Sequence, residues 1–172
     1  MKDLSMHILD IAENAVRAGA KEVDVELYHQ DNRLELVIRD NGHGMNAEMV
    51  RNITDPYTTS RTSRKVGFGL PFLKMNAEQT GGSVSVESEP GKGTCVRAIF
   101  IKDHIDCIPE GDIPATLAAL MTGHPGVNVR IRIDKNGESF DLSTEEIVEV
   151  LDGIPVSHPR VGVFVRNMLK EV

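Results

Sequence analysis

The hydrophobic pattern near the start of the chain has the period of an α-helix. Its apolar positions recur at helical spacing and form one face that suits packing on a core. These positions are Leu4, Ile8, Ile11 and Ala15. The pattern predicts one amphipathic helix over residues 4–20, with Gly19 as a natural stop signal.

A second set of positions on the same helix is polar. Asp10, Asn14 and Arg17 recur at helical spacing about a quarter-turn away from the apolar face. A carboxylate, an amide and a guanidinium in one line form either a solvated edge of the helix or one wall of a binding site. The helix alone leaves both interpretations open.

Alternation with period two follows the helix and predicts two strands. The first covers residues 22–29, and the second directs Leu34, Leu36 and Ile38 to one face. Asp40 continues that parity, and a buried carboxylate is costly unless hydrogen-bond donors surround it. The turn that follows, residues 41–45, is either a hairpin turn or a place where a ligand approaches the backbone.

Residues 46–65 show no clean periodicity, which is typical of a functional lid or of a disordered segment. The lid leads into Val-Gly-Phe-Gly-Leu-Pro at residues 66–71 and then into a predicted helix over residues 72–80. Proline suits the first turn of a helix, and glycines before it free the backbone to wrap an anion.

Two further strands, over residues 83–87 and 94–101, are joined by a tight turn rich in proline and glycine. The order helix, two strands, lid, helix, two strands predicts an α+β protein. We expect a two-layer α/β sandwich with its helices on one face of a mixed sheet.

The remaining residues predict a small α/β extension. A helix capped by Asp112 is followed by a hairpin over residues 127–142. Ser143 and Glu146 form a capping box for a further helix, and a last helix begins near Pro159. Its apolar side is expected to hold Val161, Phe164, Val165, Met168 and Val172.

Composition narrows the class of protein. A net charge of −7 argues against a general surface for nucleic acid or anionic membranes. No apolar run approaches the roughly 20 residues of a membrane span, and the N-terminus does not resemble a signal peptide. Cys95 and Cys107 are too few for a disulfide framework, so a reduced, cytoplasmic protein is expected. His104 and Cys107 share a spacing possible for metal ligands, but one pair is a weak signal.

Taken in order, the segments resemble the GHKL (Bergerat-fold) ATP-binding domain. DIAENAVRAGA resembles the N box of that family, DNGHGM its G1 box and VGFGLPFLK its G2 box. GGSVSVESEPGKGTCVRAIF resembles its closing G3 region, and PYTTSRTSRK its kinase lid. The family includes sensor histidine kinases, anti-sigma-factor kinases, gyrase B subunits, MutL and heat-shock chaperones. The resemblance covers residues 4–101, is strongest to the histidine-kinase catalytic domain, and implies an ATP-binding domain over residues 1–102 with an extension over residues 103–172.

The resemblance also implies residue roles at the adenine end of the site. Asp40 would accept a hydrogen bond from the exocyclic amine of adenine, and Thr94 would complete the pocket. The G1 residues that would let the purine lie against the backbone are Asn41, Gly42, Gly44 and Met45.

At the phosphate end, Asn14 would hold Mg²⁺ through its amide oxygen and Arg17 would reach the phosphates. Main-chain donors to the phosphate chain would come from Gly67, Phe68, Gly69 and Leu70. Positive charge from the lid, if it is not simply solvated, would come from Arg61, Arg64 and Lys65.

Two departures from the family pattern bear on function. Asp10 stands where the ATPase branch has a glutamate that activates water, so it is either a catalytic base or a residue that orients water or metal. Because the sequence starts at the N-box helix, we expect no helical hairpin with a phospho-accepting histidine before it. His7 lies on the polar stripe, but the resemblance does not imply an acceptor there.

Three functions are therefore open. The first is a kinase that phosphorylates a histidine or serine on a separate protein in bacterial signalling. The second is an ATP-hydrolysing conformational switch like MutL or gyrase, and the third is a regulator that senses ATP without catalysis. All three imply ATP with Mg²⁺ and a separate protein partner. A homodimer is left open, and the charge and hydropathy predict neither a nucleic-acid nor a membrane partner.

Overall fold

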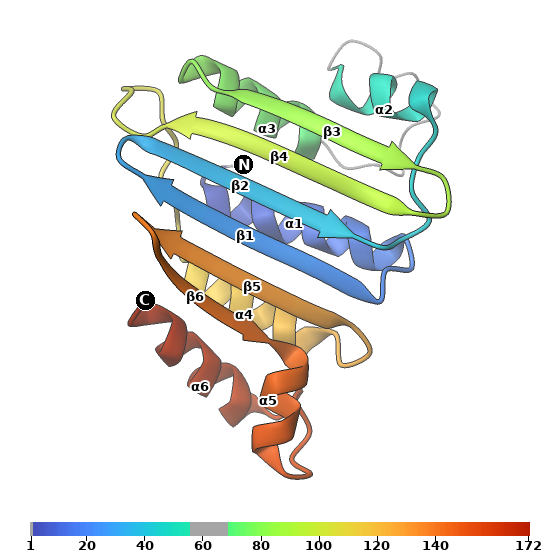
Figure 1. The fold of residues 1–172 in the computed structure, drawn as a ribbon, viewed down its shortest axis with the longest axis vertical. Coiled ribbons are helices and arrows are strands. Elements are labelled where there is room, and N and C mark those ends of the chain that lie inside the picture. The colour runs from blue at the N-terminus through green and yellow to red at the C-terminus, as the bar shows by residue number, and fades with distance from the viewer. Residues whose placement is uncertain (1, 56–68) are drawn as a thin grey trace.

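A computed structural model of the chain describes residues 2–55 and 69–172. Its elements, in chain order (Figure 1), are α1 (Leu4–Arg17), β1 (Glu22–Gln30), β2 (Arg33–Asp40), α2 (Ala47–Thr54), α3 (Gly69–Gln79), β3 (Ser83–Glu89), β4 (Gly93–Ile101), α4 (Ile113–Gly123), β5 (Asn128–Lys135), β6 (Glu138–Ser143), α5 (Thr144–Leu151) and α6 (Pro159–Lys170).

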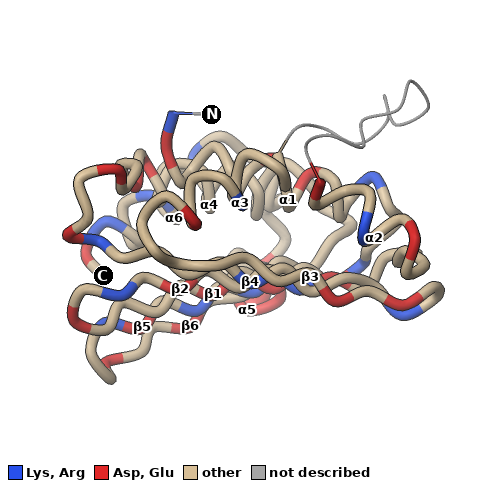
Figure 2. Tube along the Cα trace, turned by 90° about the horizontal axis from the view of Figure 1, so that it is seen from above, with Lys and Arg blue, Asp and Glu red and all other residues tan. Residues whose placement is uncertain are grey.

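The described residues form a six-stranded sheet in the order β3-β4-β2-β1-β5-β6. Neighbouring strands are antiparallel, except that β1 and β5 run parallel. Seen edge-on in Figure 2, α1, α3, α4 and α6 lie together in a layer above the sheet. The predicted two-layer α+β sandwich is therefore confirmed.

The sequence of α1 explains both of its ends and its orientation. The side chain of Asp3 accepts a hydrogen bond from the Met6 N–H and caps the first turn. The predicted apolar face is buried against the sheet. The helix ends at Arg17, three residues earlier than predicted, because Gly19 adopts a φ of +81° and turns the chain toward β1.

The segment after residue 102 supplies part of the same sheet. β5 lies parallel to β1, with Val25 opposite Ile131, and β6 pairs with β5 as the predicted hairpin. α4 packs on α1 and α6 packs on α4, and residues from both parts of the chain belong to one hydrophobic core. A strand from this segment thus joins the sheet formed by β1–β4. The division into domains at residue 102 stays a prediction.

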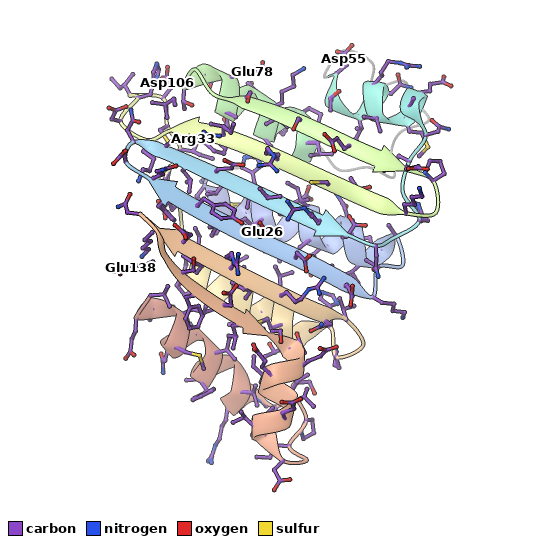
Figure 3. The ribbon with its side chains drawn as sticks, viewed as in Figure 1. Glu26, Arg33, Asp55, Glu78, Asp106 and Glu138 are labelled. Atoms are coloured by element: carbon purple, nitrogen blue, oxygen red, sulfur yellow. The ribbon has the colours of Figure 1, made fainter. Side chains whose placement is uncertain are left out.

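The face of the sheet turned away from this helix layer is charged. Figure 3 shows Glu26 in the middle of this face, where it pairs with Arg39 from β2. Arg130 of β5 lies 2.5 Å from a carboxylate oxygen of Asp24 on β1. These cross-strand ion pairs suit a surface in contact with water.

Two sequence predictions were wrong. Residues 46–65 were expected to lack a structure of their own, yet α2 begins directly after Asn46, whose side chain accepts from the Met49 N–H. In α6 the buried positions are Val161, Val165 and Leu169. Phe164, predicted on the apolar side, is 52% exposed. The remainder of the predicted lid falls in residues 56–68, outside the described residues.

Candidate functional site

The predicted polar stripe on α1 is present and lies beside α3. Nη1 of Arg17 donates to Oδ1 of Asn14 at 2.8 Å, so the amide and the guanidinium one turn apart are already paired. The α1 residues that meet α3 are one and two turns earlier, at Asp10 and His7. The stripe is therefore partly a helix–helix contact rather than a solvated edge.

Asp10 lies against the first residue of α3. A Cβ built on Gly69 would stand only 1.7 Å from Oδ2 of Asp10, so a side chain at this position would displace the Asp10 carboxylate. Oδ2 is buried and has no hydrogen-bond partner among the described residues. Burial raises the pKa of the Asp10 carboxyl, and the charge of Arg17 lowers it in part.

His7 is fully buried in the contact between α1 and α3. Its Nε2 lies 2.9 Å from Nδ2 of Asn76, while Nδ1 has no partner within the described part of the chain. Burial lowers the pKa of His7 to about 4, so the ring is neutral at physiological pH. A neutral histidine without solvent access is part of the core, which agrees with the expectation that His7 is not a phospho-acceptor.

Asp40 stands at the end of β2, opposite Thr94 of β4 and Val23 of β1. Its Oδ1 accepts from the Gly42 N–H at 2.8 Å. Burial raises the pKa of Asp40, against the opposing effect of hydrogen bonds from the Gly42 and Thr94 backbone. The predicted strand-end carboxylate is thus half-buried and partly supplied with donors by the turn that follows it.

The side chain of Asn41 is turned away from Asp40, toward the start of β1. Its Oδ1 accepts from the N–H groups of Lys21 at 2.8 Å and Glu22 at 2.9 Å. The amide oxygen is therefore engaged by the protein backbone and does not present itself to a ligand.

The two glycines of the G1 turn are required by close backbone contacts. Gly44 has a φ of +69°, and a Cβ there would lie 2.1 Å from the carbonyl oxygen of Glu89. A Cβ on Gly42 would lie 3.0 Å from Cβ of Ala18. The turn is therefore pressed between the end of α1 and the β3–β4 hairpin.

Ser88 is a site residue that the sequence reasoning missed. Its hydroxyl accepts from the Met45 N–H at 2.8 Å, donates to the Gly93 carbonyl at 2.9 Å and lies 2.8 Å from Oγ1 of Thr94. Ser88 and Thr94 are directly opposite in the β3–β4 hairpin, so the hairpin register was the signal that could have found it.

An open hollow of about 330 Å³ lies at these strand ends. It is lined by Arg39, Asp40, Glu87, Ser88, Glu89, Lys92, Gly93, Thr94 and Cys95. Arg39 and Cys95 alternate with Asp40 and Thr94 and so face the opposite side of the sheet. The hollow therefore follows the rim of the sheet, whereas the side chain of Asp40 has the parity of the helix-covered face.

The remaining predicted residues are placed as follows. Leu70 is buried in the first turn of α3, so it can offer a ligand only its backbone. Gly67, Phe68, Arg61, Arg64 and Lys65 lie outside the described residues. Nδ1 of His104 accepts from the Asp106 N–H, and residues 2–55 and 69–172 contain no group of three or more side chains suited to a metal ion.

A divalent cation would depend on a phosphate ligand at this site. Mg²⁺ is commonly bound through one or two protein oxygens together with substrate phosphates and water. Oδ2 of Asp10, which has no partner in residues 2–55 and 69–172, and the amide oxygen of Asn14 lie one turn apart on α1, which fits that donor set. Arg17 would have to release Asn14 for direct coordination.

Together, α1 unites the parts of the site. Its end meets the G1 turn, where the His43 N–H donates to the Ala18 carbonyl at 2.9 Å, and its middle meets the start of α3 at Gly69. A strand-end carboxylate, a glycine turn and a polar helix on this sandwich define an ATP-binding domain of the Bergerat type. Residues 2–105 match the family of histidine kinase-, DNA gyrase B- and HSP90-like ATPases, and the chain belongs to that family.

Curated relatives of the chain include sensor histidine kinases. It is 29% identical over 107 residues to sensor histidine kinase YxdK of Bacillus subtilis, a match covering 58% of this chain and 33% of the relative. It is 33% identical over 93 residues to sensor histidine kinase ZraS of Klebsiella oxytoca, covering 52% and 20%. For sensor protein kinase FleS of Pseudomonas aeruginosa, identity is 34% over 96 residues, covering 54% and 23%.

These matches show a histidine-kinase-like ATPase domain and, with it, ATP binding. The chain spans a third or less of the length of the three relatives described. Among the described residues, no helix has the length and apolar character needed to cross a bilayer.

Proposed function

We propose that this domain is an Mg²⁺-dependent phosphotransferase that transfers the γ-phosphoryl group of ATP to a histidine or serine of a separate protein in bacterial signalling. The observation that carries the proposal is the similarity to sensor histidine kinases, together with the family match over residues 2–105, which include α1, the G1 turn and α3. In the transfer, an acceptor nitrogen or oxygen bonds to the γ-phosphorus while the bond to the β–γ bridging oxygen breaks and ADP leaves.

The adenine end would be formed by the strand-end residues. Asp40 would accept from the exocyclic amine through its carboxylate, which adds a donor to those that the Gly42 and Thr94 backbone already supply. The G1 turn, which Gly42 and Gly44 allow to pack closely against Ala18 and Glu89, would lie beside the purine, and Thr94 would close the pocket with Ser88 behind it. Met45 is fixed beside them because its N–H donates to Ser88.

The phosphate end would be formed by α1 and the start of α3. Arg17 would move from Asn14 to the phosphates, and Asn14 with Asp10 would hold Mg²⁺, which neutralises developing charge on the phosphate oxygens. Gly69 and Leu70 would direct main-chain N–H groups toward the phosphates from the first turn of α3. Gly67, Phe68 and the basic lid residues are assigned to the same end on sequence grounds alone.

A second candidate function is an ATP-hydrolysing switch, and Asp10 favours it. A buried carboxylate oxygen that no described residue contacts by a hydrogen bond, on a group with a raised pKa, has the properties of a general base for a water molecule. In that case water bonds to the γ-phosphorus, its proton passes to Asp10, and ADP and phosphate leave.

One labelling experiment separates the candidates. Purified protein is incubated with Mg²⁺ and γ-labelled ATP, alone and with an extract of the source cells, and Asn14→Ala serves as the blank. The kinase proposal expects label on a second protein, acid-labile if on histidine and acid-stable if on serine. Label released as phosphate above the blank, without a second protein, would support the switch. ATP binding with neither product would overturn both and leave an ATP sensor.

A further inference from the structure

We infer that Asn41 is a positioning residue that fixes the G1 turn to the start of β1 and so sets the place of Asp40. The inference deepens the proposed function and rests on ATP binding through Asp40. It assigns Asn41 no contact with the nucleotide. The side chain of Asn41 binds the protein backbone, and it affects nucleotide binding only through the orientation of Asp40.

Four hydrogen bonds join the G1 turn to the connection between α1 and β1. Two of them come from the side chain of Asn41, which accepts from the N–H groups of Lys21 and Glu22. The other two are main-chain bonds, from the Asn41 N–H to the Glu22 carbonyl at 3.3 Å and from the His43 N–H to the Ala18 carbonyl at 2.9 Å. Removal of the side chain would thus break half of this set.

The connection between α1 and β1, which Asn41 binds, also forms a hydrogen bond with β5. The Asn128 N–H, at the start of β5, donates to the Lys21 carbonyl at 2.8 Å. The side chain of Asn128 in turn accepts from the Glu145 N–H at the start of α5, at 3.3 Å. The start of β1 is therefore a fixed reference, and Asn41 transmits its position to the turn.

The effect on Asp40 follows from the geometry of the turn. Asp40 precedes Asn41 directly, and its Oδ1 is oriented by the N–H of Gly42, the residue after Asn41. Two glycines in the same turn leave its backbone with wide conformational freedom unless side chains restrain it. When the side chain of Asn41 is bound to the start of β1, the peptide groups on either side of Asn41 are held in place. The Asp40 carboxylate then keeps one orientation.

The cost to the fold as a whole is small because the two side-chain bonds lie at exposed positions. Water can satisfy the Lys21 and Glu22 N–H groups when the acceptor is removed, so each bond contributes modestly to stability. The loss would fall on the direction of Asp40, and therefore on recognition of the adenine amine.

The test compares Asn41→Ala with Asn41→Asp by measuring dissociation constants for Mg-ATP and Mg-GTP. Guanine has a carbonyl where adenine has the amine, so ATP preference reports on Asp40. We expect Asn41→Ala to weaken ATP about tenfold and GTP much less, which lowers the ATP/GTP ratio. Asn41→Asp should restore ATP binding to within about threefold, because a carboxylate also accepts from two N–H groups.

Asn136→Ala is the matched control. Asn136 makes the same kind of bond at the other end of β1, accepting from the Asp31 N–H at 3.1 Å. It should lower stability without changing the ATP/GTP ratio. Hydrogen exchange in the absence of nucleotide gives a second readout, because Lys21 and Glu22 should exchange faster in Asn41→Ala and return to the wild-type rate in Asn41→Asp.

Three results would overturn the inference. These are an unchanged ATP constant in Asn41→Ala, an equal loss for ATP and GTP, or no recovery in Asn41→Asp. A wild-type protein that does not bind ATP would overturn the proposed function and this inference with it. Wild-type binding with any of the first three results would leave the proposed function intact and remove only the role of Asn41.

Discussion

The two sides of α1 differ in what they bury. On the side of α3, the contact contains His7, Asp10 and Asn76, and two of their polar atoms have no partner among the described residues. On the side of α4, α1 packs on a helix whose buried residues are all apolar, with Leu117 and Met121 completely buried. The same helix therefore carries a polar seam toward α3 and an apolar seam toward α4.

The difference shows which side of α1 contributes less to the free energy of unfolding. An apolar seam needs only well-fitted volume, whereas a buried polar atom without a partner costs free energy. The polar seam continues to Gly69, where the phosphate end of the site is proposed. Asp10, whose Oδ2 has no partner among the described residues, thus lies on the side of α1 where we propose a ligand, whereas His7 on the same side belongs to the core.

The largest expected effect comes from opening the apolar seam. Leu117→Ala should lower the free energy of unfolding by about 4 kcal/mol, because it leaves a cavity in a fully buried position. Urea unfolding followed by circular dichroism measures the loss. Val163→Ala on α6, where the side chain is 60% exposed, should cost less than about 0.5 kcal/mol. Equal losses in the two variants would contradict a shared core between α1 and α4.

The polar seam should reveal itself in the dependence of stability on pH. The pKa of His7 is near 6.5 in an unfolded chain and about 4 in the fold. Between these values the unfolded state binds more protons, so stability falls as pH falls, by about 3 kcal/mol in total. His7→Gln does not titrate at this position. Between pH 7 and pH 4 the unfolding free energy of His7→Gln should therefore fall by about 3 kcal/mol less than that of the wild type. If the two proteins lose the same unfolding free energy over this range, His7 protonates freely in the fold.

Asp10→Asn should stabilise the protein at pH 7 by about 1 kcal/mol, because it removes a buried charge from an atom without a partner. The raised pKa of Asp10 means that ionisation opposes folding, so the gain should be present above that pKa and disappear near pH 3. Thermal unfolding at both pH values measures it.

Asp112 provides the matched control with the opposite sign. The hydrogen bond from the Ala115 N–H lowers the pKa of Asp112, so its charge favours folding above the ordinary pKa of aspartate. Asp112→Asn should therefore lose stability at pH 7. If both substitutions shift stability in the same direction, the contrast between an unsatisfied and a satisfied carboxylate fails.

Most of the fold could be predicted from sequence because local patterns determine it. The alternation of Leu34, Leu36 and Ile38 and the capping box at Ser143 both act between near neighbours and both are present. The helix α2 was missed because it is only eight residues long and buries none of them fully, although Ile53 packs partly against the core. Phe164 was misplaced because α6 turns a narrower face to the core than its apolar positions suggested.

The candidate site could be predicted only in part. Asp40 and the glycines of the G1 turn follow from the family resemblance and from parity along a strand. The hydrogen bond from the Met45 N–H to Ser88 and the one from the Lys21 N–H to Asn41 join residues far apart in the chain, and no local pattern contains them. The parallel pairing of β5 with β1 likewise joins segments that lie roughly a hundred residues apart in the sequence, and it depends on tertiary contacts.

The smallest expected effect lies at the solvent edge of the apolar seam, where Oε1 of Glu13 is 2.8 Å from Nε2 of His124. Both side chains are partly exposed, so water and salt weaken the pair, and Glu13→Ala should cost about 0.5 kcal/mol. Glu78→Ala, on the outer side of α3 (Figure 3), is the control for loss of an exposed glutamate from a helix. The difference between the two variants in urea unfolding should vanish in about 1 M salt, where charges are screened within about 3 Å. A difference well above 1 kcal/mol that survives salt would mean that α1 depends on a polar link on both of its sides, and the contrast between its two seams would no longer hold.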